Sequence, residues 1–126
     1  METVTADCRP LSIFGVQTAK RLSQEAGVPV DLRRFRANVY VDLATNPDGF
    51  GEDAFVGKSL RIGPQVVVQV INRDGRCMMI TLDPDTAEKS PQILKAVAQA
   101  HDGMAGVYAA VLAEGIINPG DSVELL

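Results

Sequence analysis

Residues 65–72 (Gln-Val-Val-Val-Gln-Val-Ile-Asn) are the most β-branched segment of this chain. β-Branched side chains pack well on a pleated surface and lose rotamer freedom in a helix, so such a run favours a strand. The Gly63-Pro64 pair just before it ends whatever element precedes it. We therefore expect a central strand here, and a central strand requires further strands on both sides.

The remaining pattern supplies those strands. Residues 36–42 alternate polar and apolar side chains, which is typical of a half-buried strand. Residues 107–112 fit a strand or a helix by pattern alone, and we favour a strand because glycines at 106 and 115 bracket the segment. Further strands are expected at residues 10–14, 59–62, 78–82 and 122–126.

Two segments predict helices. In residues 16–26, apolar side chains recur at spacings of three and four, and Gly27 and Pro29 are stop signals. Ser90-Pro91 is typical of an N-cap followed by proline at the first helical position. Residues 52–56 are predicted to form a single helical turn, which Glu52 and Asp53 would cap through the helix dipole.

Six or seven short strands and two helices occur in irregular order, without the alternation of a doubly wound sheet. The predicted fold class is mainly β with peripheral helices (α+β), built as a closed or partly open mixed β-barrel. A chain of 126 residues is expected to be one domain, residues 1–126, with a core of its own.

Composition excludes several functions. The formal net charge of −4 argues against binding to nucleic acid. No apolar run is long enough to cross a bilayer, and the polar start of the chain does not match a signal peptide. We therefore expect a cytoplasmic protein with neither membrane nor nucleic acid as partner.

The two cysteines and the sole histidine do not form a zinc motif, because Cys8 and Cys77 lie far apart and His101 has no partner. Cys8 is taken as incidental. Cys77 follows Gly75 and Arg76. A neighbouring arginine favours the reactive thiolate, and glycine lets a ligand approach closely. The alternative is that Cys77 is a small buried hydrophobe.

Other polar clusters have structural interpretations. Arg33, Arg34 and Arg36 fit a solvated face or a half-buried strand edge, on which Arg34 and Arg36 share one side. The Asp83-Pro84-Asp85-Thr86 segment is typical of a turn stabilised by its own side chains. Methionines 78, 79 and 104 are interpreted as core filler.

Four stretches, taken in order, resemble the MOSC family, the domain found at the C-terminus of molybdenum cofactor sulfurases. They are Arg33-Arg34-Phe35-Arg36-Ala37-Asn38; Phe50-Gly51-Glu52-Asp53 with Leu60-Arg61-Ile62-Gly63; Arg76-Cys77 with Asp83-Pro84-Asp85-Thr86; and Gly106-Val107-Tyr108 with Gly115 and Gly120-Asp121. The resemblance extends over residues 11–126. It implies a β-barrel with helices packed outside, in agreement with the pattern.

The resemblance also implies a site for a molybdenum-pterin cofactor. Cys77 would be the metal ligand or carry transferable sulfur, Arg36 and Asn38 would hold the phosphate and ring, and Gly75 and Arg76 lie beside the thiol. Thiolate is a soft ligand suited to a redox metal. A guanidinium group suits phosphate, and an amide offers both donor and acceptor to a heterocycle.

The chain departs from the family pattern at several positions. Ala37 stands in place of proline, Gly75 in place of a polar residue, and Asp74 where many members have a second cysteine. Larger members also carry an N-terminal β-rich region that contacts the cofactor, which this chain is expected to lack. Full sulfurases bind pyridoxal phosphate in a separate domain, and no segment here resembles that domain.

Two alternatives therefore stay open beside cofactor binding or sulfur transfer. One is a binding or accessory module without catalysis. The other is half of a composite site, completed by a partner or by a second copy that pairs with residues 66–71 if these lie at a sheet edge. Redox chemistry would need a protein partner for electron or sulfur transfer. The substrate and the oligomeric state stay open.

Overall fold

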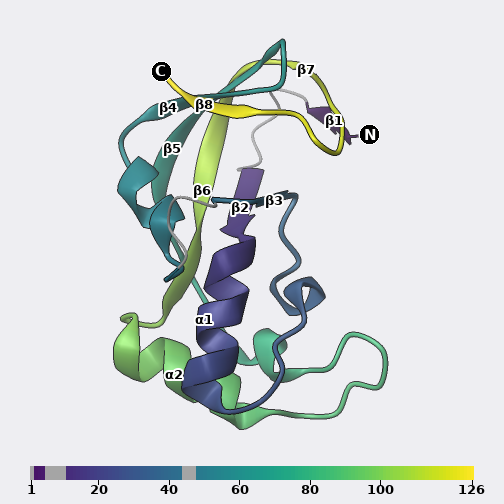
Figure 1. Cartoon of the computed structure of the whole chain (residues 1–126), viewed down its shortest axis with the longest axis vertical. Coiled ribbons are helices and arrows are strands. Elements are labelled where there is room, and N and C mark those ends of the chain that lie inside the picture. The colour runs from purple at the N-terminus through teal and green to yellow at the C-terminus, as the bar shows by residue number, and fades with distance from the viewer. Residues whose placement is uncertain (1, 5–10, 44–47) are drawn as a thin grey trace.

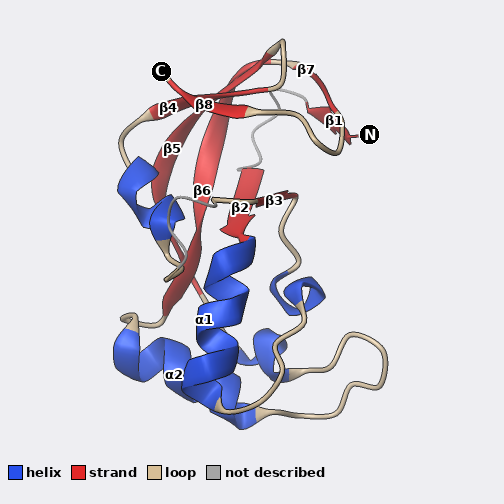
Figure 2. Cartoon of the chain, viewed as in Figure 1, coloured by secondary structure: helices blue, strands red, loops and turns tan. Residues whose placement is uncertain are grey.

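A computed structural model of the chain describes residues 2–4, 11–43 and 48–126, so Cys8 lies outside the described residues. The strands are β1 (Glu2–Val4), β2 (Leu11–Gly15), β3 (Val39–Val41), β4 (Ser59–Ile62), β5 (Val66–Gly75), β6 (Met104–Ala113), β7 (Gly115–Ile117) and β8 (Val123–Leu125). The α-helices are α1 (Val16–Ala26) and α2 (Pro91–Ala100), and the 3₁₀ helices are η1 (Leu32–Phe35), η2 (Gly51–Phe55) and η3 (Met78–Thr81). Strands gather at one end of the molecule and α-helices at the other (Figure 1, Figure 2).

Six strands form a curled half-barrel in the order β3-β2-β6-β5-β4-β8, and β1 pairs with β7. The β2–β3 pair is parallel and the other pairs are antiparallel, so the sheet is mixed. β5 lies between β4 and β6, which confirms the central strand and rules out a free edge at residues 66–71. The predicted class, mainly β with peripheral helices in a partly open barrel, is confirmed.

The sheet and the helices enclose two apolar clusters. Alternate side chains of β5 are fully buried in the first cluster, as a central strand requires. That cluster consists of Ile13, Val39, Val41, Leu60, Ile62, Val66, Val68, Val70, Val107, Ala109 and Ile117. The second, between the α-helices and the 3₁₀ segments, consists of Phe14, Ala19, Leu22, Phe35, Ile80, Ile93, Val97 and Ala105.

α1 has the predicted bounds, and its C-cap residue is Gly27. The φ of Gly27 is 72°, a left-handed conformation that glycine adopts without a steric penalty. The N-terminus of α1 is capped from a distant part of the chain. Glu52 is fully buried and accepts hydrogen bonds at the start of α1. The prediction that Glu52 caps its own turn was therefore wrong, because the tertiary fold brings η2 against the first turn of α1.

Residues 78–82 were predicted to be a strand, and this was wrong: Met78–Thr81 is η3. The Thr81 hydroxyl donates to the carbonyl of Met78 at 2.7 Å, a local bond that competes with strand pairing. The carbonyl of Thr81 instead accepts a hydrogen bond from the guanidinium of Arg34. Met78 is 58% exposed and Met79 is also exposed, so neither is core filler.

The strand expected at residues 36–42 is shorter, because β3 begins at Val39 and η1 precedes it. Asp31 starts η1 by accepting a hydrogen bond from the backbone N–H of Arg33. None of the helices among the described residues has the length and apolar character needed to cross a bilayer.

Candidate functional site

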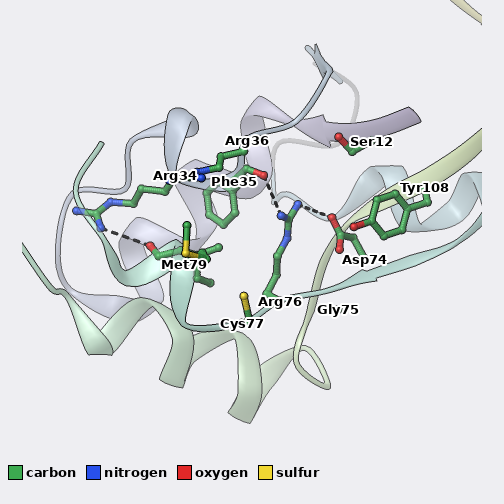
Figure 3. A pocket seen from close by; sticks show the side chains of 11 residues that line it. Ser12, Arg34, Phe35, Arg36, Asp74, Gly75, Arg76, Cys77, Met79 and Tyr108 are labelled. Carbon is green, nitrogen blue, oxygen red and sulfur yellow. Dashed lines mark hydrogen bonds and ion pairs between the residues drawn. The ribbon is translucent and has the colours of Figure 1, made fainter. Parts of the chain in front are cut away.

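A pocket of about 250 Å³ lies where the end of β5 meets η1, η3 and β6 (Figure 3). It is lined by Ser12, Arg34, Phe35, Arg36, Asp74, Gly75, Arg76, Cys77, Met79, Ile80 and Tyr108. The volume is slightly below the roughly 300–1,000 Å³ typical of small-molecule sites. Four of the five sequence-predicted site residues line it: Arg36, Gly75, Arg76 and Cys77.

Cys77 is a free, exposed thiol at the start of η3. Its sulfur lies between the side chains of Met79 and Arg76 (Figure 3). The exposure excludes the interpretation of Cys77 as a small buried hydrophobe. The thiol is placed where a ligand in the pocket can reach it.

Arg76 points into the protein and joins three elements. Its Nε donates to the carbonyl of Ala105 and its Nη1 to that of Phe35, both at 2.9 Å. The guanidinium lies over the ring of Phe14 at 5.6 Å, and that ring stacks on Phe35. Burial lowers the pKa of Arg76 from its ordinary value, and Asp74 works against that shift.

Asp74 is the buried partner of Arg76. Its side chain is 3% exposed, and its Oδ2 lies 2.9 Å from Nη2 of Arg76. Burial raises the pKa of Asp74, while Arg76 and the hydroxyl of Tyr108 act in the opposite direction. Burial is also the main cause that raises the pKa of Tyr108, followed by its hydrogen bond with Asp74. The inner end of the pocket is thus an acid in contact with a guanidinium and with a phenol.

The arginine cluster divides into three environments, and this corrects the prediction that Arg34 and Arg36 share one side. Arg33 is 58% exposed and pairs with Asp31 and Asp85. Arg34 is 6% exposed and donates to the carbonyls of Ile80 and Thr81.

Arg36 differs from both neighbours. It follows η1 in the left-handed conformation, with φ of 51°, and it is exposed at the pocket. Within residues 11–43 and 48–126, no hydrogen bond or ion pair engages its guanidinium. Arg36 is therefore the cation of the cluster that is available to an incoming anion.

Asn38 does not line the pocket. Its Oδ1 accepts hydrogen bonds from the backbone N–H and the hydroxyl of Ser12, at 2.9 and 3.0 Å. Ser12 does line the pocket, so Asn38 acts on it through Ser12. At Gly75, no described atom lies within 4 Å of where a Cβ would stand, which leaves open space beside Cys77.

Sequence reasoning assigned no role to Ser12 and Tyr108. Tyr108 had a signal, because it ends the Gly-Val-Tyr stretch that resembles the family motif. Asp74 was noted only as a departure from the family. Its contact with Tyr108 arises because β5 pairs with β6, in which Tyr108 lies opposite Asn72, two residues before Asp74. No group of three or more potential metal-ligating side chains occurs in the part of the chain that the structure describes.

The fold and this pocket together define a small, mainly β domain with an exposed thiol beside guanidinium groups. The sequence matches the MOSC domain family over residues 2–124, and the chain belongs to that family. Membership of this family indicates, in general terms, a domain related to the molybdenum cofactor.

Two crystal structures have a similar fold. YiiM from Geobacillus stearothermophilus superposes with a TM-score of 0.68 at 24% identity, covering 92% of this chain and 53% of that one. The YuaD protein from Bacillus subtilis gives a TM-score of 0.69 at 18% identity, covering 91% of this chain and 62% of that one. The chain thus spans little more than half the length of these proteins. No curated protein matches the chain in sequence.

Proposed function

We propose that the pocket binds a molybdenum-pterin cofactor and that Cys77 acts as its metal ligand or as a sulfur carrier. The observation that carries the proposal is that one pocket contains the exposed Cys77 thiol and the guanidinium of Arg36, which has no partner among the described residues. A thiolate is a soft ligand, and a guanidinium binds phosphate oxygens in a bidentate manner. Membership of the MOSC family supports the same cofactor class.

The residues present fit this group. Nη2 of Arg76, a residue that lines the pocket, lies 2.9 Å from Asp74 but is buried without a well-aligned hydrogen bond, so it retains donor capacity. Arg36 would hold the phosphate of the cofactor. Ser12, which is hydrogen-bonded to Asn38, would contact the pterin ring, and the open space at Gly75 would admit the cofactor beside Cys77. The bound cofactor would supply redox or sulfur-transfer chemistry at the thiol.

The roles of the protein groups follow from their positions. Arg76 holds the carbonyls of Phe35 and Ala105 and so fixes η1, and with it Arg36, relative to Cys77. The apolar side chain of Met79 lies to one side of the thiol (Figure 3). The proposed setting is the cytoplasm, where thiols are kept reduced.

Metal and pterin content of the purified protein, after expression in a host that makes the cofactor, tests the proposal. We expect near-equimolar molybdenum in the wild type and a complete loss in Cys77→Ser. Cys8→Ser is the matched control, because it removes the chain's other thiol, and it should load like the wild type. Loading retained in Cys77→Ser would refute the proposal.

A composite site is the second candidate, and the size and exposure of the pocket favour it. About 250 Å³ holds only part of a pterin cofactor with its phosphate, and both Cys77 and Arg36 are exposed. A redox or sulfur-transfer protein would then cover the rest of the cofactor. Loading that requires added partner protein supports this version, and a folded protein with neither metal nor pterin supports an accessory module.

A further inference from the structure

The inner end of the pocket, where Asp74 meets Arg76, carries no net charge, although three arginines line the pocket. Asp74 and Arg76 face each other with Oδ2 and Nη2 2.9 Å apart, and both side chains are about nine-tenths buried or more. Opposite charges at this distance offset each other for a third group that is about equally far from both. An anion that enters beyond Arg36 therefore meets a carboxylate as well as a guanidinium.

Two polar groups at this end retain bonding capacity. Nη2 of Arg76 is buried without a hydrogen bond of good geometry, despite its short distance to Asp74. An ionised carboxylate offers about four acceptor positions, and the known contacts of Asp74 are Arg76 and the Tyr108 hydroxyl. Acceptor positions beside a buried donor match a planar group that presents both N–H donors and an acceptor.

We propose that Asp74 determines the ligand selectivity of the pocket: it rejects small inorganic oxyanions from the inner end and selects a ligand with an N–H-bearing heterocyclic edge there. This inference rests on the proposed function, because it states which part of the ligand the inner end holds. The anionic part of the ligand then lies toward Arg36, a lining residue whose guanidinium has no partner among the described residues.

A structural counter-ion would behave differently. If Asp74 only held Arg76 in place, its replacement by asparagine would leave the charge preference of the pocket unchanged or weaken all ligands alike. Selectivity predicts opposite changes for two probes. In Asp74→Asn, no negative charge offsets Arg76 toward an oxyanion, and an N–H donor meets a neutral amide with one acceptor oxygen in place of a charged carboxylate.

The test measures binding of two metal-free probes to the purified protein: inorganic phosphate by calorimetry and neutral 2-amino-4-oxopteridine by its fluorescence. The wild type should bind the pteridine more tightly than phosphate. In Asp74→Asn, phosphate should bind about tenfold more tightly and the pteridine about tenfold more weakly, the range of one charged hydrogen bond.

Glu124→Gln is the matched control, since it removes the same charge from an exposed position on β8 and should leave both affinities unchanged. Affinities in Asp74→Asn that do not change, or that move in the same direction, would overturn the inference. If that variant does not fold, the wild type still decides, because a preference for phosphate over the pteridine overturns it.

The outcome is separate from that of the cofactor experiment. Neither probe contains metal, so their binding does not depend on a role of Cys77 as metal ligand. A protein that fails to load molybdenum but passes this test keeps the selectivity and loses the metal role of Cys77. A protein that loads molybdenum but fails the probe test would support the cofactor proposal and refute the role of Asp74 in selectivity.

Discussion

The Oε2 atom of Glu52 lies 2.6 Å from the backbone nitrogen of Gly15, the N-cap residue of α1. Its other oxygen accepts the hydroxyl of Thr18 at 2.7 Å. The first N–H groups of a helix have no partner within the helix, and a negative charge there is favourable to the helix dipole. A buried acid 37 residues away in sequence thus replaces the side-chain cap that Gly15 cannot provide.

Replacing Glu52 by alanine should lower the free energy of unfolding by about 2–3 kcal/mol, because a charged acceptor is lost and buried donors stay unsatisfied. Urea denaturation measures the change. Glu124→Ala, at an exposed ion pair on β8, should change stability by less than about 1 kcal/mol. Equal losses in the two variants would contradict a special role for Glu52.

Arg34 and Arg33 provide a matched pair of adjacent arginines. Arg34 is buried and bonded to the carbonyls of η3, while Arg33 is exposed. Arg34→Ala should destabilise the protein by about 2–4 kcal/mol, since it leaves the carbonyls of η3 without this donor. Arg33→Ala should cost about 0–1 kcal/mol. Thermal unfolding of both variants tests this, and a larger loss in Arg33→Ala would refute it.

Gly106 is required by its surroundings as well as by its backbone. Its φ is 82°, and a Cβ there would lie 2.9 Å from the Phe14 ring and 3.2 Å from Nη2 of Arg76. Gly106→Ala should therefore destabilise by about 2–3 kcal/mol. Gly57→Ala is the control, with φ of 83° and no described atom within 4 Å of the Cβ position. It should show only the backbone strain of about 1 kcal/mol.

Burial raises the pKa of Asp74 above its ordinary value of 3.8, so the folded protein holds this proton more tightly than the unfolded chain does. The contribution of this proton to stability is fully present below the unfolded pKa and is lost as the pH rises through the folded pKa. Relative to Asp74→Asn, the wild type should therefore gain stability as the pH falls toward 3.8.

Parallel denaturation of wild type and Asp74→Asn across this pH range measures the difference. Asp53, whose pKa burial also raises, is present in both proteins, so its contribution cancels. A difference that does not change with pH, or that changes in the opposite sense, would show that the pKa of Asp74 is not raised in the folded state.

Sequence patterns correctly predicted the elements that are formed by interactions between residues close together in the chain. α1 has its predicted bounds because apolar spacing and Gly27 act within the helix itself. β5 is central, as its β-branched run predicts, and its alternate valines are buried in the core. The prediction of a strand at residues 78–82 was wrong, since η3 depends on Arg34. This residue lies more than 40 positions earlier and donates hydrogen bonds to the carbonyls of η3.

The sequence by itself determined the fold class and the neighbourhood of the site, because strand propensity, turn residues and adjacency of Arg76 to Cys77 are properties of short segments. Only the tertiary structure decided which charged side chains are buried, which are paired and which are exposed at the pocket. The three cluster arginines differ in burial because η1 turns their side chains toward different surroundings. Asp74, Arg76 and Tyr108 meet because β5 pairs with β6, a contact between distant segments that no local pattern encodes.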